Sequence, residues 1–140
     1  LRPRISSANY YLLENGKIVK SFGSESGWAI NLRWLPDINQ NGIDEFAITY
    51  GGGMHQGQGG TGIDIHEFSN GKVKTLGWFA ESAYSETSEY SYKVWVKKGK
   101  TPVYYRDKYV PNKSNKQVKV GKTTTFKLNN NSGDGFKVWK

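Results

Sequence analysis

Two Asn-Gly dipeptides, each set between runs of aromatic and β-branched residues, limit what this chain can fold into. They occur in "YYLLENGKIVKSF", residues 10–22, and in "IDIHEFSNGKVKTLGWF", residues 63–79. Asn-Gly favours the type I′ turn, whose twist matches the two strands of a β-hairpin. Because side chains alternate along a strand, the second run places Ile63, Ile65 and Glu67 on one face. Both stretches therefore predict antiparallel hairpins.

Similar alternation recurs in residues 92–110, around Lys98-Gly99, and in residues 116–128, around Gly121. No stretch has apolar residues at helical spacing between recognisable caps. We interpret residues 79–91 as a polar loop and residues 51–62, which hold seven glycines, as a turned connection. The expected fold class is all-β, with antiparallel hairpins that form a blade-like sheet or a compact β-sandwich and little or no helix.

Chain length and aromatic content indicate a single β domain over residues 1–140. The chain has 5 Trp, 9 Tyr and 6 Phe, and such large rings can build a core where aliphatic residues are few. No run approaches the ~18 apolar residues of a membrane-spanning helix, so no transmembrane segment is expected. The absence of cysteine excludes a disulfide framework, a thiol nucleophile and a cysteine zinc site.

Charge is distributed unevenly along the chain. Residues 1–92 have 7 Lys and Arg against 10 Asp and Glu, a balance of −3, whereas residues 93–140 have 13 against 2, a balance of +11. The basic, aromatic region 92–140 therefore suggests an acidic polymer or glycan as partner, and nucleic acid stays open. The alternative is a lysine-coated β surface that keeps edge strands unpaired.

One polar stretch, "PDINQNGIDEFAITYGGG" at residues 36–53, has the spacing of a metal-binding loop. Counting Asp37 as position 1, oxygen-bearing groups fall at alternating positions, as a hard cation such as Ca²⁺ requires. The set consists of the side chains of Asp37, Asn39, Asn41 and Glu45 and the main-chain carbonyl of Ile43. An EF-hand is excluded because its twelfth position is Ile48, within an expected strand. The competing interpretation is a polar turn whose Asx side chains cap main-chain N–H groups.

The stretch resembles the calcium loop of an FG-GAP or VCBS-type repeat, in which an Asp-x-Asn/Asp-x-Asn/Asp-Gly-x-Asp-Asp/Glu pattern lies between two strands. The resemblance covers about residues 28–79, with "WAINLRWLPD" before the loop and "EFAITYGGG" after it. It implies one bound Ca²⁺, held by Asp37, Asn39, Asn41, Glu45 and the Ile43 carbonyl, in a propeller-blade-like unit. It also implies a secreted, periplasmic or cell-surface setting, because a loop with two neutral Asn ligands would bind calcium weakly.

The sequence supports three functional hypotheses. The first is a non-catalytic exported domain with one structural Ca²⁺, acting in binding or scaffolding with a partner protein or neighbouring repeats. The second is a module that binds a polyanion or carbohydrate through the basic region, with candidate residues Lys93, Trp95, Lys97, Tyr104, Tyr105 and Arg106. The third is a small hydrolase that uses His55 or His66 as a base, although no motif supplies a nucleophile. No cofactor other than Ca²⁺ and no catalytic residue is predicted.

Overall fold

The computed structural model describes residues 10–22, 28–55 and 58–130, and these residues form strands, turns and connections without any helix. The all-β expectation is thereby confirmed. Consistent with this, the described residues include no helix of the length and hydropathy that crossing a membrane requires. The strands are β1 (Tyr10–Glu14), β2 (Lys17–Phe22), β3 (Trp28–Trp34), β4 (Glu45–His55), β5 (Gln58–Ser69), β6 (Lys72–Tyr84), β7 (Glu89–Lys97), β8 (Val103–Pro111) and β9 (Gln117–Phe126).

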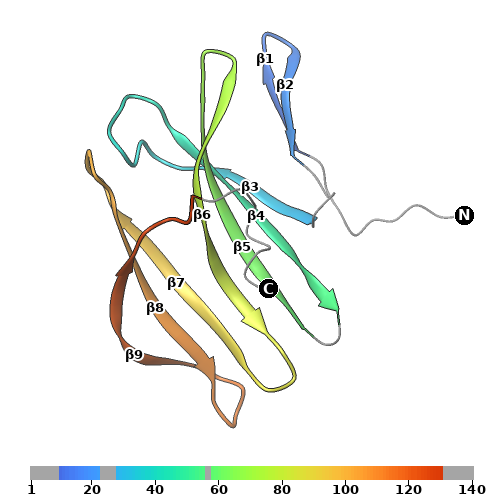
Figure 1. Cartoon of the computed structure of the whole chain (residues 1–140), viewed down its shortest axis with the longest axis vertical. Coiled ribbons are helices and arrows are strands. Elements are labelled where there is room, and N and C mark those ends of the chain that lie inside the picture. Colours follow the sequence, from blue (N-terminus) through green and yellow to red (C-terminus); the bar gives the residue numbers. More distant parts are fainter. Residues whose placement is uncertain (1–9, 23–27, 56–57, 131–140) are drawn as a thin grey trace, which may run out of the picture.

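From β3 to β9 the strands follow one another in space in the order of the chain (Figure 1). β1 and β2 form a separate hairpin, and β3 to β9 form a seven-stranded sheet in which each strand pairs antiparallel with the next. Both Asn-Gly turns adopt the left-handed backbone that the sequence predicts, with φ of 53° and 78° at Asn15 and Gly16 and of 54° and 73° at Asn70 and Gly71. Hairpin turn chemistry therefore sets the local topology.

Two sequence interpretations are wrong in detail. The glycine-rich stretch is not a simple connection, because β4 and β5 pair as far as His55 and Gln58. The Tyr84 ring packs over Gly59, where an added Cβ would lie 2.6 Å from the Tyr84 hydroxyl oxygen unless that side chain moved. Residues 79–91 form most of a hairpin rather than a loop, and Gly121 lies inside β9 at a register shift, with φ of 74°. A glycine at positive φ inside a strand marks a bulge as readily as a turn.

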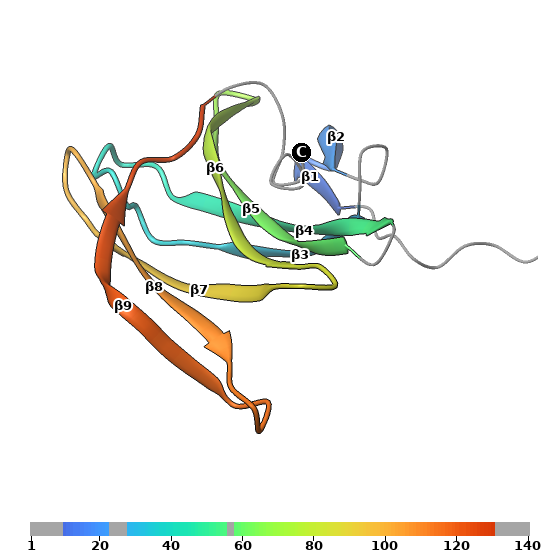
Figure 2. The same ribbon diagram turned by 60° about the horizontal axis from the view of Figure 1, so that its bottom comes forward.

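The curved sheet buries apolar side chains on both faces. On one face, Phe46, Ile48 and Tyr50 pack with Leu12 of the β1–β2 hairpin. On the other face a second cluster contains Ala47, Ile63, Ile65 and Phe79, and Phe126 and Leu128 pack against it. Figure 2 shows the curvature, with β8 and β9 turned away from β3 and β4. We call the face with the second cluster the inner face.

The sheet is loosely joined between β6 and β7, where only three residue pairs face each other. The chain beyond β9 returns to β6 instead: Trp78 and Asn129 exchange two main-chain hydrogen bonds of 2.8 Å. A pocket of about 140 Å³ remains on the inner face, lined by residues of both parts of the sheet that include Ile63, Ile65, Phe79, Val94 and Tyr104.

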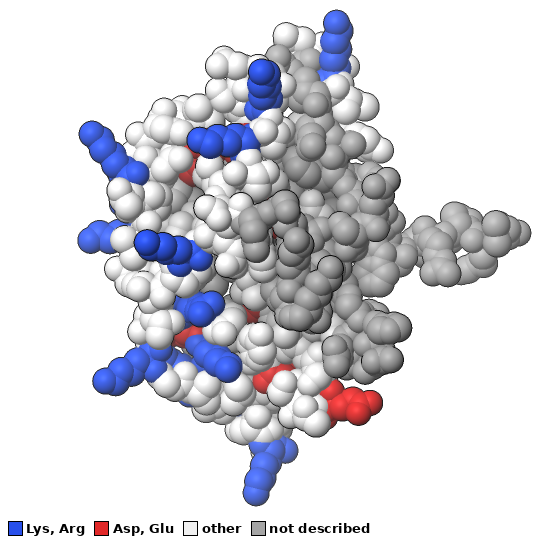
Figure 3. All heavy atoms as spheres, viewed as in Figure 1, with Lys and Arg blue, Asp and Glu red and all other residues white. Residues whose placement is uncertain are grey.

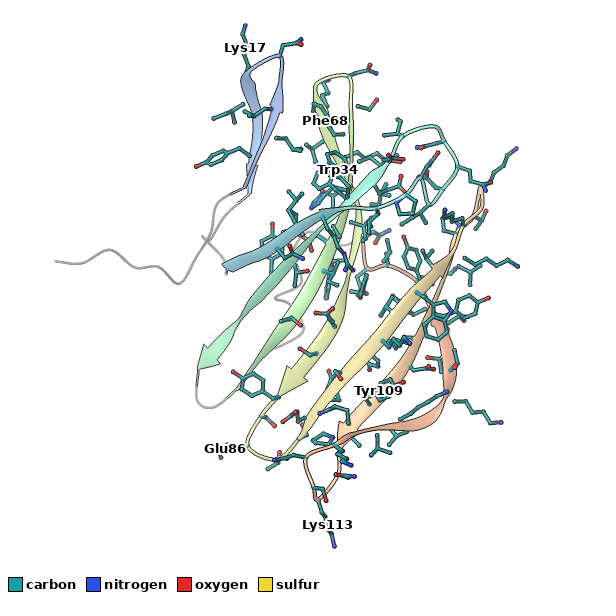
Figure 4. The ribbon with its side chains drawn as sticks, turned by 180° about the vertical axis from the view of Figure 1, so that it is seen from behind. Lys17, Trp34, Phe68, Glu86, Tyr109 and Lys113 are labelled. Atoms are coloured by element: carbon teal, nitrogen blue, oxygen red, sulfur yellow. The ribbon has the colours of Figure 1, made fainter. Side chains whose placement is uncertain are left out.

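The β6–β7 and β8–β9 turns lie at the same end of the sheet, where Figure 4 shows Glu86 and Lys113.

Candidate metal centre

The loop between β3 and β4 is held by its own polar side chains. The two carboxylate oxygens of Asp37 accept hydrogen bonds from the main-chain N–H groups of Asn41, at 3.1 Å, and Gly42, at 2.7 Å. The Asn41 side-chain oxygen accepts one from the N–H of Ile43 at 3.0 Å. Gly42, with φ of 87°, permits the turn that these bonds close. The capped Asx turn considered as the competing interpretation is thus present.

The loop ends on a carboxylate that faces a second carboxylate. Glu45 begins β4 and is paired in register with Glu67 of β5. Their side chains share the inner face with the facing pair Ala47 and Ile65. Glu45 is 0% exposed and Glu67 is 4% exposed, so neither charge is relieved by bulk water. Two acidic residues therefore occupy one buried position of the ladder.

Amide groups of the loop approach the same point. The side-chain N–H₂ groups of Asn39 and Asn41 donate hydrogen bonds to one oxygen of Glu67, at 3.0 Å and 2.7 Å. The main-chain N–H of Ile38 donates to one oxygen of Glu45 at 2.5 Å. Two buried oxygens, Oδ1 of Asn39 and Oε2 of Glu45, have no hydrogen-bond donor among the described residues. Buried oxygens of this kind are commonly satisfied by an unobserved water or ion.

Burial dominates the electrostatics of this cluster. It raises the pKa of Glu45 from 4.5 to about 7, against the lowering effect of the Ile38 N–H, and a side-chain hydrogen bond with Glu67 and then the negative charges of Glu67 and Asp37 raise it further. Tyr104 of β8 also lies near: its pKa is raised to about 12, first by burial and then by the charge of Glu45. The cluster has no ion pair to any described Lys, Arg or His.

The donor set suits a hard cation only if amide and main-chain oxygens take part. No three His, Cys, Asp or Glu side chains of the described residues form a metal-binding group. The N–H of Leu35 nevertheless closes the base of the loop by bonding to the carbonyl of Glu45 at 2.8 Å, and the N–H of Gly99 holds the loop itself by bonding to the carbonyl of Ile38 at 3.0 Å. Of the predicted ligands, Asp37, Asn39, Asn41 and Glu45 all lie in this cluster.

Glu67 is the residue of the cluster that the sequence did not suggest as a ligand. Its alternation with Ile63 and Ile65 correctly placed it on their face. Its partner could not be predicted, because the register between β4 and β5 depends on a glycine-rich connection that resembled a loop. The available signal was an acidic residue on the apolar face of the second strand after the loop, β5.

The candidate residues of the basic region divide between two faces. Lys93, Trp95, Lys97 and Tyr105 alternate with the inner-face residues and lie on the outer face, where the Trp95 and Tyr105 rings stack at 5.8 Å with an angle of 12°. Tyr104 and Arg106 lie on the inner face, as the facing pairs with Val96 and Val94 show. The six residues therefore do not form one site.

Of the two histidines, His66 is buried in the sheet. The His66 side chain is buried on the face opposite Glu67, where its Nδ1 lies 2.9 Å from the Thr75 hydroxyl and its ring stacks on Phe46. Its Nε2 is 3.9 Å from the carboxylate of Asp64. The side chain of His55 lies outside the described part of the structure. Among the described residues, His66 therefore packs against Phe46 and lies beside the polar groups of Thr75 and Asp64.

Comparisons with known proteins give no relative for this chain. No protein family matches the sequence, and no curated protein or solved structure matches it. The calcium-loop resemblance therefore stands on the loop residues themselves.

Proposed function

We propose that the β3–β4 loop and Glu67 bind one Ca²⁺, and that the chain is a non-catalytic exported domain that acts in binding or scaffolding. The observation that supports this most is the buried facing pair of Glu45 and Glu67. Like charges directly opposite each other on a sheet are destabilising, and burial increases the cost. A divalent cation is one of two ways to relieve it, and a shared proton is the other.

The oxygen groups of the loop and of Glu67 suit calcium if the loop adjusts around the ion. Carboxylate oxygens would come from the facing pair Glu45 and Glu67, and from Asp37 once it releases the loop N–H groups, and the Asn39 amide oxygen is buried without a donor among the described residues. Asn amides carry oxygen and nitrogen at nearly interchangeable places, so the amides that now donate to Glu67 can present oxygen after rotation. Asn41 and the carbonyl of Ile43 would complete the about six to eight oxygens that calcium prefers. Bound calcium would supply the positive charge that the cluster lacks.

The role of the metal would be structural. The loop joins β3 to β4, and Glu67 belongs to β5, so one ion would fix three neighbouring strands. Because such a site is assembled only in the folded chain, calcium binding would add to folding stability. Two of the loop ligands are neutral, which favours a dissociation constant of about 10⁻⁴–10⁻³ M, the range of extracellular calcium modules. This range supports an exported rather than a cytosolic setting.

The test is a thermal melt of EDTA-treated protein, titrated with Ca²⁺ and separately with Mg²⁺ up to about 5 mM, several times the expected dissociation constant. Wild type should gain several degrees with Ca²⁺ and much less with Mg²⁺, which demands a smaller octahedral site. Asp37→Ala and Glu67→Gln should lose the calcium response.

Asp44→Asn is the matched control, because Asp44 is an exposed carboxylate of the same loop that forms no hydrogen bond with the described residues. It should respond to calcium as wild type does. An equal response of all variants would place any calcium effect elsewhere on the chain, and no response of wild type would leave the loop a capped turn.

A further inference from the structure

A half-buried arginine on the inner face of β8 is held between aromatic rings. The guanidinium carbon of Arg106 lies 4.5 Å from the ring centre of Tyr92 on β7 and 5.0 Å from that of Phe126 on β9. Two residues further along β8, on the same face, the ammonium of Lys108 lies 4.8 Å from the ring centre of Tyr90. The two tyrosine rings meet edge to face at 5.4 Å. Two cations are thus fixed on a small aromatic base.

These cations have no anionic partner in the described residues. Neither Arg106 nor Lys108 forms an ion pair, and the Arg106 guanidinium makes no hydrogen bond there. Stacking uses the flat faces of a guanidinium and leaves its in-plane N–H groups available, in a fork that matches the two oxygens of a carboxylate or sulfate. Restriction by the rings also lowers the entropy lost when an anion binds.

The opposite face of the same strands provides a contrast. Asp107 follows Arg106 and points the other way, where it accepts a hydrogen bond from Thr123 at 2.5 Å and lies 3.4 Å from the ammonium of Lys119. The outer-face lysine therefore has a carboxylate partner, whereas the inner-face cations have none. On the face seen in Figure 3, most Lys and Arg side chains lie on the left-hand side of the molecule, and several lie close together towards the lower left. The local geometry of Arg106 and Lys108 distinguishes a specific anion site from this general positive charge.

We propose that Arg106 and Lys108 form a binding site for the carboxylate or sulfate groups of an acidic polysaccharide. Residues two apart on a strand lie about 6.4–6.8 Å apart, so the pair can meet successive anionic groups of one polymer. The cations cover ring faces of Tyr90, Tyr92 and Phe126. A single-stranded nucleic acid would need those ring faces for base stacking, so the arrangement favours a polysaccharide over a nucleic acid. The site is independent of calcium and lies on different strands from the metal loop.

The test uses heparin as the sulfated probe and polygalacturonate as the carboxylate probe, with neutral dextran and single-stranded DNA for comparison. Binding is measured by calorimetry at about 50 and 500 mM NaCl, because polyanion binding weakens with salt. Arg106→Gln should weaken binding of an acidic polysaccharide by about tenfold or more, and Lys108→Gln by less. Arg106→Lys should recover little, because lysine keeps the charge but not the fork.

Lys119→Gln is the matched control, since it removes the same unit of charge from the same pair of strands on the outer face. It should change affinity less than about twofold. Equal losses in Arg106→Gln and Lys119→Gln would show diffuse charge attraction and overturn the proposal. Tighter binding of DNA than of both polysaccharides, or no binding by wild type, would also overturn it.

Folding of each variant is checked by circular dichroism. If Arg106→Gln unfolds, the affinities of Arg106→Lys and Lys108→Gln test the proposal. Wild-type affinity in both variants would overturn it. Repeating the titration in EDTA and in calcium separates this site from the metal loop, because the anion affinity should not depend on calcium.

Discussion

Glu45 and Glu67 face each other across the β4–β5 ladder, both almost fully buried. The described residues give the pair only N–H donors, from Ile38, Asn39 and Asn41, and no cationic side chain. Charged groups rarely lie in such a position without a proton, a cation or a partner of opposite charge. This relationship motivates the calcium proposal and sets the behaviour expected of the metal-free protein.

Metal-free protein should lose stability as the pH rises. The pKa of Glu45 is about 7 in the folded chain and 4.5 as its ordinary value, so the folded state binds this proton more tightly. The stabilisation is complete below about pH 4.5 and is lost as the pH rises through about 7. Melting temperatures in EDTA between about pH 5 and 8 should therefore fall.

Excess calcium should reverse that trend, because a bound cation favours the ionised carboxylate and protons compete with it. Melts in calcium should then be at least as stable at about pH 8 as at pH 5. A parallel decline in EDTA and in calcium would contradict metal binding at this pair.

Glu45→Gln should stabilise the metal-free protein at about pH 8, where wild type must keep the buried carboxylate charged or bind a proton. The gain should be on the order of a few kcal/mol at most, and it should shrink towards about pH 5. Urea titrations of both proteins in EDTA measure it. A loss of stability at both pH values would show that the carboxylate has a favourable partner.

Gly77→Ala should destabilise the protein through the contact that joins β6 to the chain after β9. An added Cβ would lie 2.6 Å from the Cβ of Leu128 and 2.8 Å from the carbonyl oxygen of Asn129, and φ at this position is +152°. The expected loss exceeds about 2 kcal/mol.

Gly16→Ala is the comparison for that change, because its φ is +78° but nothing lies within 4 Å of an added Cβ. It should cost only about 1 kcal/mol, the usual strain of a left-handed backbone. Denaturant melts that rank the two the other way would show that the Trp78–Asn129 bridge matters little.

Phe46→Ala should be among the most damaging core substitutions. Phe46 is fully buried, and the centre of its ring lies 5.3 Å from that of Trp34 and 5.2 Å from that of His66. Removing it should cost about 3–5 kcal/mol. Trp34→Ala should cost less because Trp34 is 57% exposed. Thermal melts compare the two, and equal losses would contradict this assignment of the core.

Local signals in the sequence predict much of this fold. The Asn15-Gly16 and Asn70-Gly71 turns and the alternation along β5 and β7 follow directly from backbone preference and the two-residue period of a strand. The predictions of a turned connection at residues 51–62 and of a loop at residues 79–91 are wrong, because composition alone does not show that a long partner strand is available. Strand formation depends on the neighbouring strand more than on intrinsic propensity.

The candidate metal site shows the same division. Asp37, Asn39, Asn41 and Glu45 follow from their spacing within one loop. Glu67 is 22 residues from Glu45 by numbering and meets it only through the register of the β4–β5 hairpin. Likewise, the pairing of Arg106 with the rings of Tyr92 and Phe126 needs three strands in register. Contacts across strands are set by tertiary pairing, which a single sequence does not specify.

The most direct measurement of the central proposal is calcium stoichiometry. Equilibrium dialysis of EDTA-stripped protein against ⁴⁵Ca²⁺ should give about one ion per chain at concentrations near 10⁻³ M. Glu67→Gln and Asp37→Ala should bind little, while Asp44→Asn should match wild type. No bound calcium in wild type at that concentration, or full binding in Glu67→Gln, would contradict the account.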